Sequence, residues 1–301
     1  MRAETTFNVM GSQAHLLVLD GSGIDHLAYG ERRLRELESR WSRFRSDSDI
    51  GRLNAAAGRA ITVGRDTMTL LTRSIRAWRL TEGAFDPTVG QSMHAYGYDR
   101  DFSLLGDRSE PAGSRPAPGC AGIELDHDTG RVRMPAAVRF DAGGIGKGLA
   151  ADLVAGELLR RGAGGVVVNV GGDLRVAGEP PDAAGWVVGV DDPRRPGADL
   201  LRVALPAGAI ATSSTLRRRW RQGATDCHHL MDPHTGRPAQ GPSVAVSVVA
   251  AEAWWAEVMA KALLLAERPG EHPLAAGVEF VVLCADGEVV TSPALTGLVA
   301  A

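Results

Sequence analysis

The chain has 301 residues, of which 44% are hydrophobic and 23% charged, an ordinary balance for a globular protein with a full core. Its 33 basic and 36 acidic residues give a net charge of only −3, which argues against a nucleic-acid-binding protein. No apolar run approaches the ~18 residues of a membrane-spanning helix. The first residues contain no apolar leader, so a cytoplasmic protein without a membrane segment is expected, although a removed leader stays open. Three widely spaced cysteines, Cys120, Cys227 and Cys284, favour a reducing compartment over disulfides or a zinc site.

The first half of the chain is predicted to contain a strand followed by two long helices. Residues 7–20 alternate between polar and apolar side chains, which favours a strand. Apolar residues recur at helical spacing over residues 24–44 and again over residues 65–86, where Gly83 is expected to end the helix. Residues 106–119 are rich in proline, glycine and charge, and they predict a flexible surface loop.

The second half is predicted to begin with a hairpin around residues 128–130. A helix over residues 146–161 follows, then a series of strands and turns, a helix over residues 252–267 and a terminal hairpin over residues 278–292. Two groups of strands and about four long helices, with no break in composition, predict one intertwined α+β domain over residues 1–301.

The stretch FDAGGIGKGLAADLV, residues 140–154, has glycines and a lysine where a helix is expected to start. A P-loop would require glycine at 141 and a hydroxyl at 148, but this chain has Asp141 and Gly148, so that loop is excluded. Residues 146–151 imitate the dinucleotide fingerprint without its β-α-β surroundings. The free N–H groups of a helix start and the charge of Lys147 still favour an anion; a plain glycine turn with a surface lysine is the alternative.

Three further polar segments lie at the ends of predicted strands: VNVGGDLR (168–175), ATSSTLRRRW (211–220) and HHLMDPHTGRP (228–238). Loops at strand ends can converge on one ligand pocket, although each segment alone is equally typical of a turn. The basic residues at 217–221 favour a solvated rim over a nucleic-acid patch.

The order and content of these segments resemble the ApbE family of flavin transferases. The blocks that carry the resemblance, in family order, are MGS (10–12), SRFRSDSDIGRLN (42–54), GAFDPTVG (83–90), DAGGIGKGLAAD (141–152), VNVGGDLR, ATSS and HHLMDPHTGRP. They extend from Met10 to about residue 265 with the C-terminal helix included. The resemblance implies a T-fold-like α+β domain with two groups of mainly antiparallel strands and flanking helices.

The resemblance also implies a reaction. Family members cleave FAD, transfer FMN to a Thr or Ser hydroxyl of an acceptor protein and release AMP, assisted by Mg²⁺. His229 would take the hydroxyl proton, since a neutral imidazole suits that task near pH 7; a purely structural histidine is the alternative. The positions implied to contact FAD are Met10, Phe44, Ala84, Phe85, Asp86, Asp141, Lys147 and Met231.

The implied metal site departs from the family pattern. Family members carry ADALAT on the C-terminal helix, whose Asp and Thr join a backbone carbonyl, here that of Gly144, around Mg²⁺. This chain has AEVMAK, which places Glu257 and Lys261 at those two positions. A protonated lysine has no lone pair and cannot bind a metal. Either the Lys261 ammonium replaces the metal beside the pyrophosphate, or Glu257 and Lys261 form an exposed pair without a catalytic role.

Three functions therefore stay open at this point. The first is an FAD:protein FMN transferase with altered metal dependence. The second is an FAD pyrophosphatase, in which water replaces the acceptor hydroxyl and the products are FMN and AMP. The third is a catalytically inactive FAD-binding protein. The acceptor protein and the oligomeric state do not follow from the sequence.

Overall fold

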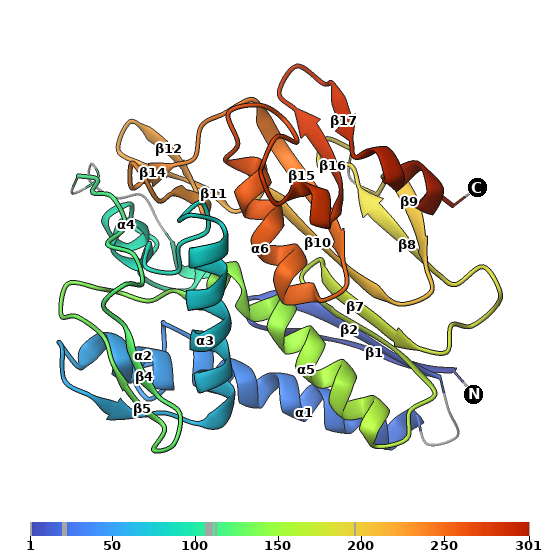
Figure 1. Cartoon of the computed structure of the whole chain (residues 1–301), viewed down its shortest axis with the longest axis horizontal. Coiled ribbons are helices and arrows are strands. Elements are labelled where there is room, and N and C mark those ends of the chain that lie inside the picture. The colour runs from blue at the N-terminus through green and yellow to red at the C-terminus, as the bar shows by residue number, and fades with distance from the viewer. Residues whose placement is uncertain (1, 20–22, 106–110, 112, 196, 301) are drawn as a thin grey trace. The chain divides into compact units, whose positions relative to one another are not determined.

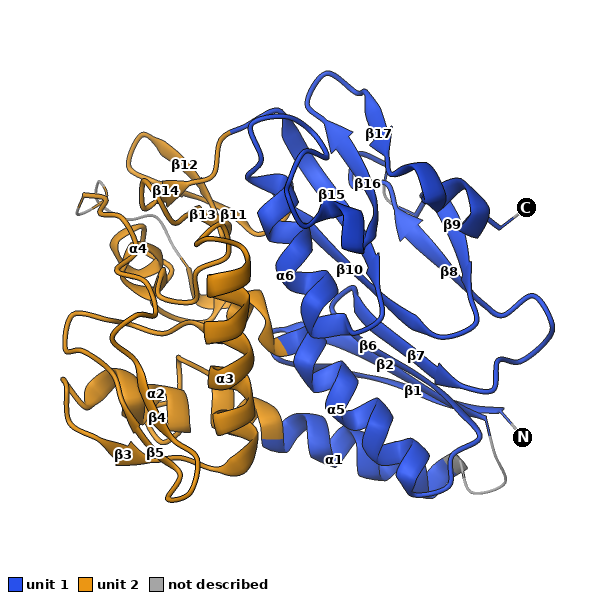
Figure 2. Cartoon of the chain, viewed as in Figure 1, with its two compact units in different colours: residues 1–36, 147–216, 241–301 blue, residues 37–146, 217–240 orange. Residues whose placement is uncertain are grey.

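The computed structural model describes residues 2–19, 23–105, 111, 113–195 and 197–300 (Figure 1). The chain divides into two compact units: residues 1–36, 147–216 and 241–301 form the first unit, and residues 37–146 and 217–240 form the second (Figure 2). Each unit is thus built from segments that are distant in sequence. That residues 1–301 act as a single domain stays a prediction. The loop predicted at 106–119 lies partly outside the described residues, and its residues 113–119 contain no helix or strand.

The first unit contains an eight-stranded sheet in which each neighbouring pair of strands is antiparallel. The α+β class and the mainly antiparallel pairing that the sequence predicted are therefore confirmed. In order across the sheet the strands are β1 (Arg2–Val9), β2 (Ser12–Leu19), β6 (Gly165–Val170), β7 (Asp173–Gly178), β10 (Gly208–Ser214), β15 (Ser243–Ala250), β16 (Glu279–Cys284) and β17 (Val289–Thr291).

Two hairpins of this sheet close through pairs of residues with positive φ. Met10 and Gly11, with φ of 53° and 63°, join β1 to β2, and Gly171 and Gly172, with φ of 65° and 97°, join β6 to β7. Positive φ at both central residues is typical of the type I′ turn that suits the twist of paired strands. The single strand predicted over residues 7–20 is wrong, because the chain reverses at Met10 and forms parts of two strands.

Helices α5 (Gly146–Arg160) and α6 (Ala253–Leu264) belong to the first unit apart from Gly146, and α1 (Gly23–Trp41) begins there (Figure 2). Glu157 of α5 ties α1 to α5, because it accepts hydrogen bonds from Tyr29 at 2.9 Å and from Arg33 at 3.0 Å. Among the described residues, no helix combines the length and the apolar character needed to cross a membrane.

The first turn of α5 lies directly against the start of α6. A Cβ atom on Gly148 would lie 2.4 Å from the carbonyl oxygen of Ala253, so only glycine allows this approach. Asp152, one turn further along α5, accepts hydrogen bonds from the N–H groups of Ala253 and Trp254, both at 2.9 Å. Gly148 thus serves helix packing, and Asp152 caps α6 and fixes the position of its side chains.

An apolar cluster of the first unit joins the sheet to the hairpin of β8 (Trp186–Asp191) and β9 (Asp199–Leu205). Buried side chains of the sheet, such as Leu17 and Val176, meet Trp186 and Val203 of the hairpin. Two short 3-10 helices, η3 (Ala275–Gly277) and η4 (Pro293–Leu298), complete the unit, and Leu295 of η4 joins the cluster.

The second unit consists of short helices and small sheets. Its helices are α2 (Asp49–Ala55), α3 (Arg65–Leu80), α4 (Gly90–Ala95), η1 (Phe102–Leu104) and η2 (Ala142–Gly144), and its strands are β3 (Ile61–Thr62), β4 (Glu124–Asp126), β5 (Arg131–Arg133), β11 (Arg219–Gln222), β12 (Thr225–His228), β13 (Met231–Asp232) and β14 (Arg237–Pro238). Strand β5 lies between β3 and β4, and the other four strands form two hairpins. The hairpin predicted around residues 128–130 is confirmed by the pairing of β4 with β5.

Helix α3 ends earlier than the sequence predicted, and the residue that ends it is not glycine. The helix stops at Leu80, and Glu82 takes the left-handed conformation with φ of 51°. The N–H groups of Gly83 and Glu82 then donate to the carbonyls of Trp78 and Arg79 at 2.9 and 3.3 Å. This pair of bonds is the Schellman motif, in which glycine usually holds the left-handed position. The GAFD segment starts directly from this turn.

Candidate functional site

Four ionic side chains meet at the start of α5 in the first unit. Lys147 donates hydrogen bonds to Asp173, the first residue of β7, and to Oε1 of Glu257 on α6, the latter at 2.9 Å. Lys261, one turn beyond Glu257 on the same helix, places its Nζ 3.4 Å from the same Oε1. We call Lys147, Asp173, Glu257 and Lys261 the charge cluster. The structure thus brings together three predicted site residues and adds Asp173.

The carboxylates are the covered members of the charge cluster. The side chains of Asp173 and Glu257 keep only 2% and 1% of their surface exposed, whereas those of Lys147 and Lys261 keep 17% each. Solvent and ligands therefore reach the cluster through its lysines.

Burial and neighbouring charges together set the pKa of each member of the charge cluster. Burial and the charge of Glu257 raise the pKa of Asp173. Burial also favours a higher pKa for Glu257, but the charges of Lys147 and Lys261 outweigh it and lower that pKa. Burial lowers the pKa of Lys261, whereas for Lys147 the charges of Asp173 and Glu257 outweigh burial and raise the pKa. Glu257 therefore stays ionised between two ammonium groups.

The residues at 257 and 261 do not fit a divalent cation. Oε2 of Glu257 accepts the Gly148 N–H at 2.9 Å, and Oε1 accepts hydrogen bonds from the ammonium groups of both lysines. Mg²⁺ requires oxygen ligands in near-octahedral geometry, whereas a lysine ammonium offers only donors. Gly144 belongs to the other unit. The predicted metal site of Gly144, Glu257 and Lys261 stays a prediction, and the donors present argue against it.

In the second unit, Arg43 links Asp141 to Phe44. The Nε of Arg43 lies 3.0 Å from Oδ2 of Asp141, and its Nη1 donates to the carbonyl of Tyr98 at 2.7 Å. The guanidinium also lies over the rings of Phe44 and Tyr98, 4.2 and 4.7 Å from their centroids. Oδ1 of Asp141 accepts the Gly143 N–H at 2.7 Å and so fixes the start of η2. The sequence reasoning missed Arg43, although it lies next to Phe44 in a family block.

Aromatic rings continue outward from Arg43. The rings of Tyr98 and Trp220 are 5.4 Å apart, and that of Phe102 lies 6.2 Å from Tyr98 and 6.4 Å from Trp220. We call Phe44, Tyr98, Phe102 and Trp220 the aromatic cluster. Phe44 is its accessible member, with 40% of its surface exposed. An exposed ring beside a fixed cation offers a flat surface on which a planar ligand can stack.

The GAFD segment supports its own loop. Asp86 accepts hydrogen bonds from the N–H and hydroxyl of Thr88 at 2.7 and 2.6 Å, and the Thr88 hydroxyl accepts the Gly119 N–H at 3.0 Å. Burial raises the pKa of Asp86. Phe85 is buried, and Ala84 is partly exposed. The structure therefore gives Asp86 and Phe85 a structural role in this loop, while contact with FAD stays a prediction for them.

The two adjacent histidines differ in their surroundings. His228, at the end of β12, is buried, accepts the Leu230 N–H through Nδ1 at 3.3 Å, and donates from Nε2 to the Ala239 carbonyl at 2.9 Å. These bonds fix the neutral tautomer, and burial lowers the pKa of His228. His229 is half-buried in the connection between β12 and β13. His228 is thus structural, and the assignment of His229 as the base stays a prediction.

The connection beyond His229 leads to Met231, which opens β13. Met231 is buried in an apolar cluster with Met93, Tyr96, Tyr98 and Cys227. The segment ATSS forms the end of β10 and pairs with β15, which confirms the strand predicted over residues 209–214. The polar segment predicted at 211–220 therefore leaves the strand only after Ser214.

The predicted residues are divided between the two units. Those of the first unit are Met10, Lys147, Glu257 and Lys261, and those of the second unit are Phe44, Ala84, Phe85, Asp86, Asp141, Gly144, His229 and Met231. Asp173 was missed although its block VNVGGDLR was recognised. Asp173 is the only acidic residue of that block, and this was the only feature of the block that could have indicated its place in the site.

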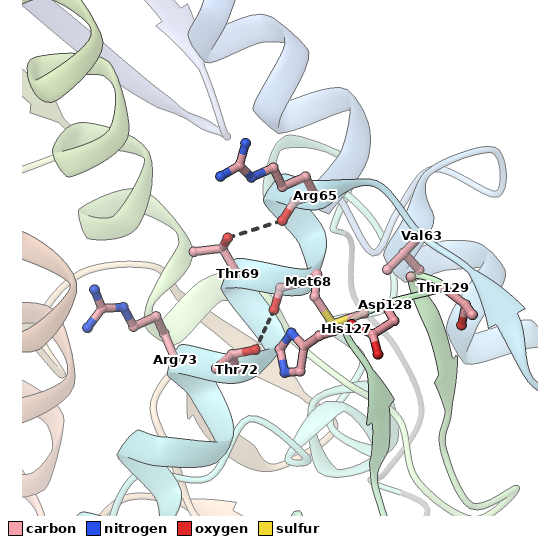
Figure 3. A pocket seen from close by; sticks show the side chains of 10 residues that line it. Val63, Arg65, Met68, Thr69, Thr72, Arg73, His127, Asp128 and Thr129 are labelled. Atoms are coloured by element: carbon pink, nitrogen blue, oxygen red, sulfur yellow. Dashed lines mark hydrogen bonds between the residues drawn. The ribbon is translucent and has the colours of Figure 1, made fainter. Parts of the chain in front are cut away.

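A separate pocket of about 510 Å³ belongs to the second unit (Figure 3). Its wall includes Arg65, Arg73 and His127. The hydroxyls of Thr69 and Thr72 point back to their own helix and donate to the carbonyls of Arg65 and Met68 at 3.1 and 2.8 Å (Figure 3). The pocket contains none of the predicted site residues.

Comparison with known proteins gives the family. The model of the ApbE family matches residues 10–280. An FAD:protein FMN transferase of Vibrio cholerae is 28% identical over 239 residues, covering 78% of this chain and 71% of that protein. One of Rhodobacter capsulatus is 29% identical over 302 residues, covering 96% of this chain and 56% of that protein. The crystal structure of the ApbE protein of Thermotoga maritima has the same fold, with a TM-score of 0.89 over the whole of both chains at 23% identity. The chain belongs to the ApbE family.

Proposed function

We propose that this chain is an FAD:protein FMN transferase. The observation that carries the proposal is the family match over residues 10–280, a range that includes every predicted site residue. In the proposed reaction the oxygen of an acceptor Thr or Ser hydroxyl forms a bond to the phosphorus of the FMN half. The P–O bond to the other phosphate breaks, and AMP leaves with the electron pair of that bond.

We assign FAD contacts to the residues that the family resemblance implies. Phe44 offers its exposed ring to a planar ring system, and Arg43 holds Phe44 and Asp141 in fixed positions. Lys147 offers a positive charge to the phosphates. The remaining proposed contacts are Met10, Ala84, Phe85, Asp86 and Met231.

His229 is proposed to take the proton of the acceptor hydroxyl. Its neighbour His228 supports this role, because the hydrogen bonds of His228 to Leu230 and Ala239 fix the backbone on either side of His229. A general base must be held within hydrogen-bonding reach of the proton that it removes. Mg²⁺ would supply charge neutralisation in this reaction, but the donors of Glu257 and Lys261 do not fit a divalent cation.

We also propose a cytoplasmic location. The three free cysteines, Cys120, Cys227 and Cys284, are all buried, which supports a reducing compartment.

The decisive experiment incubates the protein with FAD and a panel of acceptor proteins, with mass spectrometry of the acceptors and an assay for AMP. The expected result is an FMN adduct on a Thr or Ser and one AMP per adduct. AMP and free FMN without any acceptor would establish the pyrophosphatase instead. FAD that stays bound and intact, with Mg²⁺ or without it, would establish a binding protein.

A further inference from the structure

Both lysines of this chain belong to the charge cluster. The chain has 33 basic residues, of which only Lys147 and Lys261 are lysines and the other 31 are arginines. Their two ammonium groups contact the same oxygen, Oε1 of Glu257, at 2.9 and 3.4 Å. A lysine ammonium is a compact point charge, whereas a guanidinium is a wide planar fork. The chain thus uses the compact cation at one place only, where two of them share one carboxylate.

The charges of this cluster already balance. Two ammonium groups face two carboxylates, those of Asp173 and Glu257, which are 2% and 1% exposed. A divalent cation added beside them would introduce two uncompensated positive charges at a buried site, which is strongly unfavourable. The cluster therefore excludes a metal by its charge as well as by its donors.

The accessible part of the cluster suits an anion. The lysine side chains keep 17% of their surface exposed, so an approaching ligand meets ammonium groups before carboxylates. An ammonium has three N–H donors. Within the part of the chain that the structure describes, Lys147 donates to Asp173 and Glu257, and Lys261 donates to the side chain and the backbone carbonyl of Glu257. Each lysine therefore has one N–H left for a ligand, and a phosphoryl group has oxygens enough to accept both.

We propose that Lys147 and Lys261 form a metal-independent site for a phosphoryl group, in which the Lys261 ammonium takes the place of a divalent cation. Glu257 is a positioning residue, since it holds both ammonium groups and the Gly148 N–H of α5. Asp173, at the start of β7, positions Lys147 of α5. Naming the pyrophosphate of FAD as the bound group rests on the proposed function, whereas the anion site itself rests on the cluster alone.

The two lysines allow a direct test on the unaltered protein. Labelling with ¹³Cε-lysine gives two lysine Cε signals in the NMR spectrum, and the Lys261→Arg variant assigns them. In the presence of EDTA, inorganic pyrophosphate is expected to shift both signals. In a separate sample, one equivalent of Mn²⁺ without pyrophosphate is expected to broaden neither. The proposal is overturned if Mn²⁺ broadens both signals, or if pyrophosphate moves neither.

Variants test the role of Lys261. Lys261→Met, which keeps the length and removes the charge, is expected to weaken pyrophosphate binding about 10- to 100-fold, the value of one charge-assisted hydrogen bond. The double variant Glu257→Asp with Lys261→Thr is expected to bind Mn²⁺. The matched control is Glu271→Asp, the same chemical change at an exposed glutamate, which is expected to bind none. A folded double variant that binds no Mn²⁺ would show that Lys261 is not what excludes the metal.

AMP release from FAD separates this inference from the proposed function. With FAD and an acceptor protein present, the native protein is expected to release AMP at the same rate, within about twofold, in EDTA and in Mg²⁺. Loss of AMP release in EDTA alone overturns the metal-independent site. If no AMP forms under any condition, the proposed function fails, and the pyrophosphate and Mn²⁺ experiments still decide the anion site.

Discussion

The charge cluster of the first unit and the aromatic cluster of the second both contain residues expected to bind FAD, but their cations are held differently. Lys147 faces two buried carboxylates, whereas Arg43 faces one, Asp141, donates to the Tyr98 carbonyl and lies over the rings of Phe44 and Tyr98. In the charge cluster, ammonium groups pair with carboxylates. In the aromatic cluster, the ring of Phe44 stays exposed. Asp141 and Lys147 belong to one continuous stretch of sequence, yet Asp141 lies in the second unit and Lys147 in the first. One motif therefore serves two separate chemical tasks.

This difference separates residues that support the structure from residues that act on a ligand. Changes in the charge cluster are expected to lower stability together with function, because its members are buried and depend on one another. Changes at the accessible residues of the second unit are expected to lower function and leave stability nearly unchanged.

The largest expected effect is at His229. Removing a general base typically costs about 10²- to 10⁴-fold in rate, so His229→Ala is expected to slow flavinylation of the acceptor by that factor. Its free energy of unfolding should change by less than about 1 kcal/mol. The matched variant at the neighbouring position, His228→Asn, should lower stability and, because His228 only positions the backbone around His229, should slow transfer per folded molecule less than His229→Ala does. Equal loss of transfer in both variants would remove the distinction between the two histidines.

The next effect concerns Glu257. Glu257→Ala leaves two ammonium groups facing one remaining carboxylate, that of Asp173, and breaking a buried pair in this way costs about 3–5 kcal/mol. Urea denaturation measures the loss. Glu271→Ala is the control, since the Glu271 side chain is 66% exposed and pairs with an exposed arginine, Arg268. Such exposed pairs contribute at most about 1 kcal/mol. A loss below that level for Glu257→Ala would mean that the cluster does not stabilise the fold.

The smallest effect is the pH dependence that His228 introduces. Burial lowers the pKa of His228 below its ordinary value of 6.5. The unfolded chain therefore takes up a proton below that pH while the folded protein resists it. Stability is fully present above pH 6.5 and falls as the pH drops below it. The slope from one proton is at most about 1.36 kcal/mol per pH unit. Asp152 and Asp173, whose pKa values are raised by burial, also titrate in this range, so the measurement is the difference between the native protein and His228→Asn, whose denaturation curves between pH 7 and pH 5 should differ by this slope.

The helices and strands whose apolar residues recur at a regular spacing were predictable from the sequence. Helices α1, α3, α5 and α6 follow from apolar residues at helical spacing, and the hairpins of β4–β5 and β16–β17 follow from alternating residues around a turn. The turn at Met10 and the end of α3 at Glu82 were not predictable, because both residues have positive φ and neither residue type favours it. Local sequence does not report such conformations when the surrounding sheet or helix imposes them.

The candidate site was predictable where its residues are close in sequence. Glu257 and Lys261 lie four apart on one helix, so their contact follows from helical geometry. The contact of Lys147 with Glu257 joins residues 110 apart, and Asp173 contacts Lys147 from the start of β7. These contacts depend on the approach of α5 to α6 at Gly148, which no pattern in the sequence specifies. The charge balance of the cluster could therefore be recognised only in the folded chain.

The placement of both lysines has a consequence for proteolysis. A protease that cuts after lysine has only two cleavage points in this chain, and both lie in helices that meet at the charge cluster. Cleavage requires an extended backbone, so the protease can cut only when α5 or α6 has unfolded locally. When opening is rapid and reversible, the cleavage rate reports the free energy of that opening. The rate of cleavage after lysine therefore measures how stable the charge cluster is. A ligand that bridges the two ammonium groups should slow cleavage of the chain by this protease.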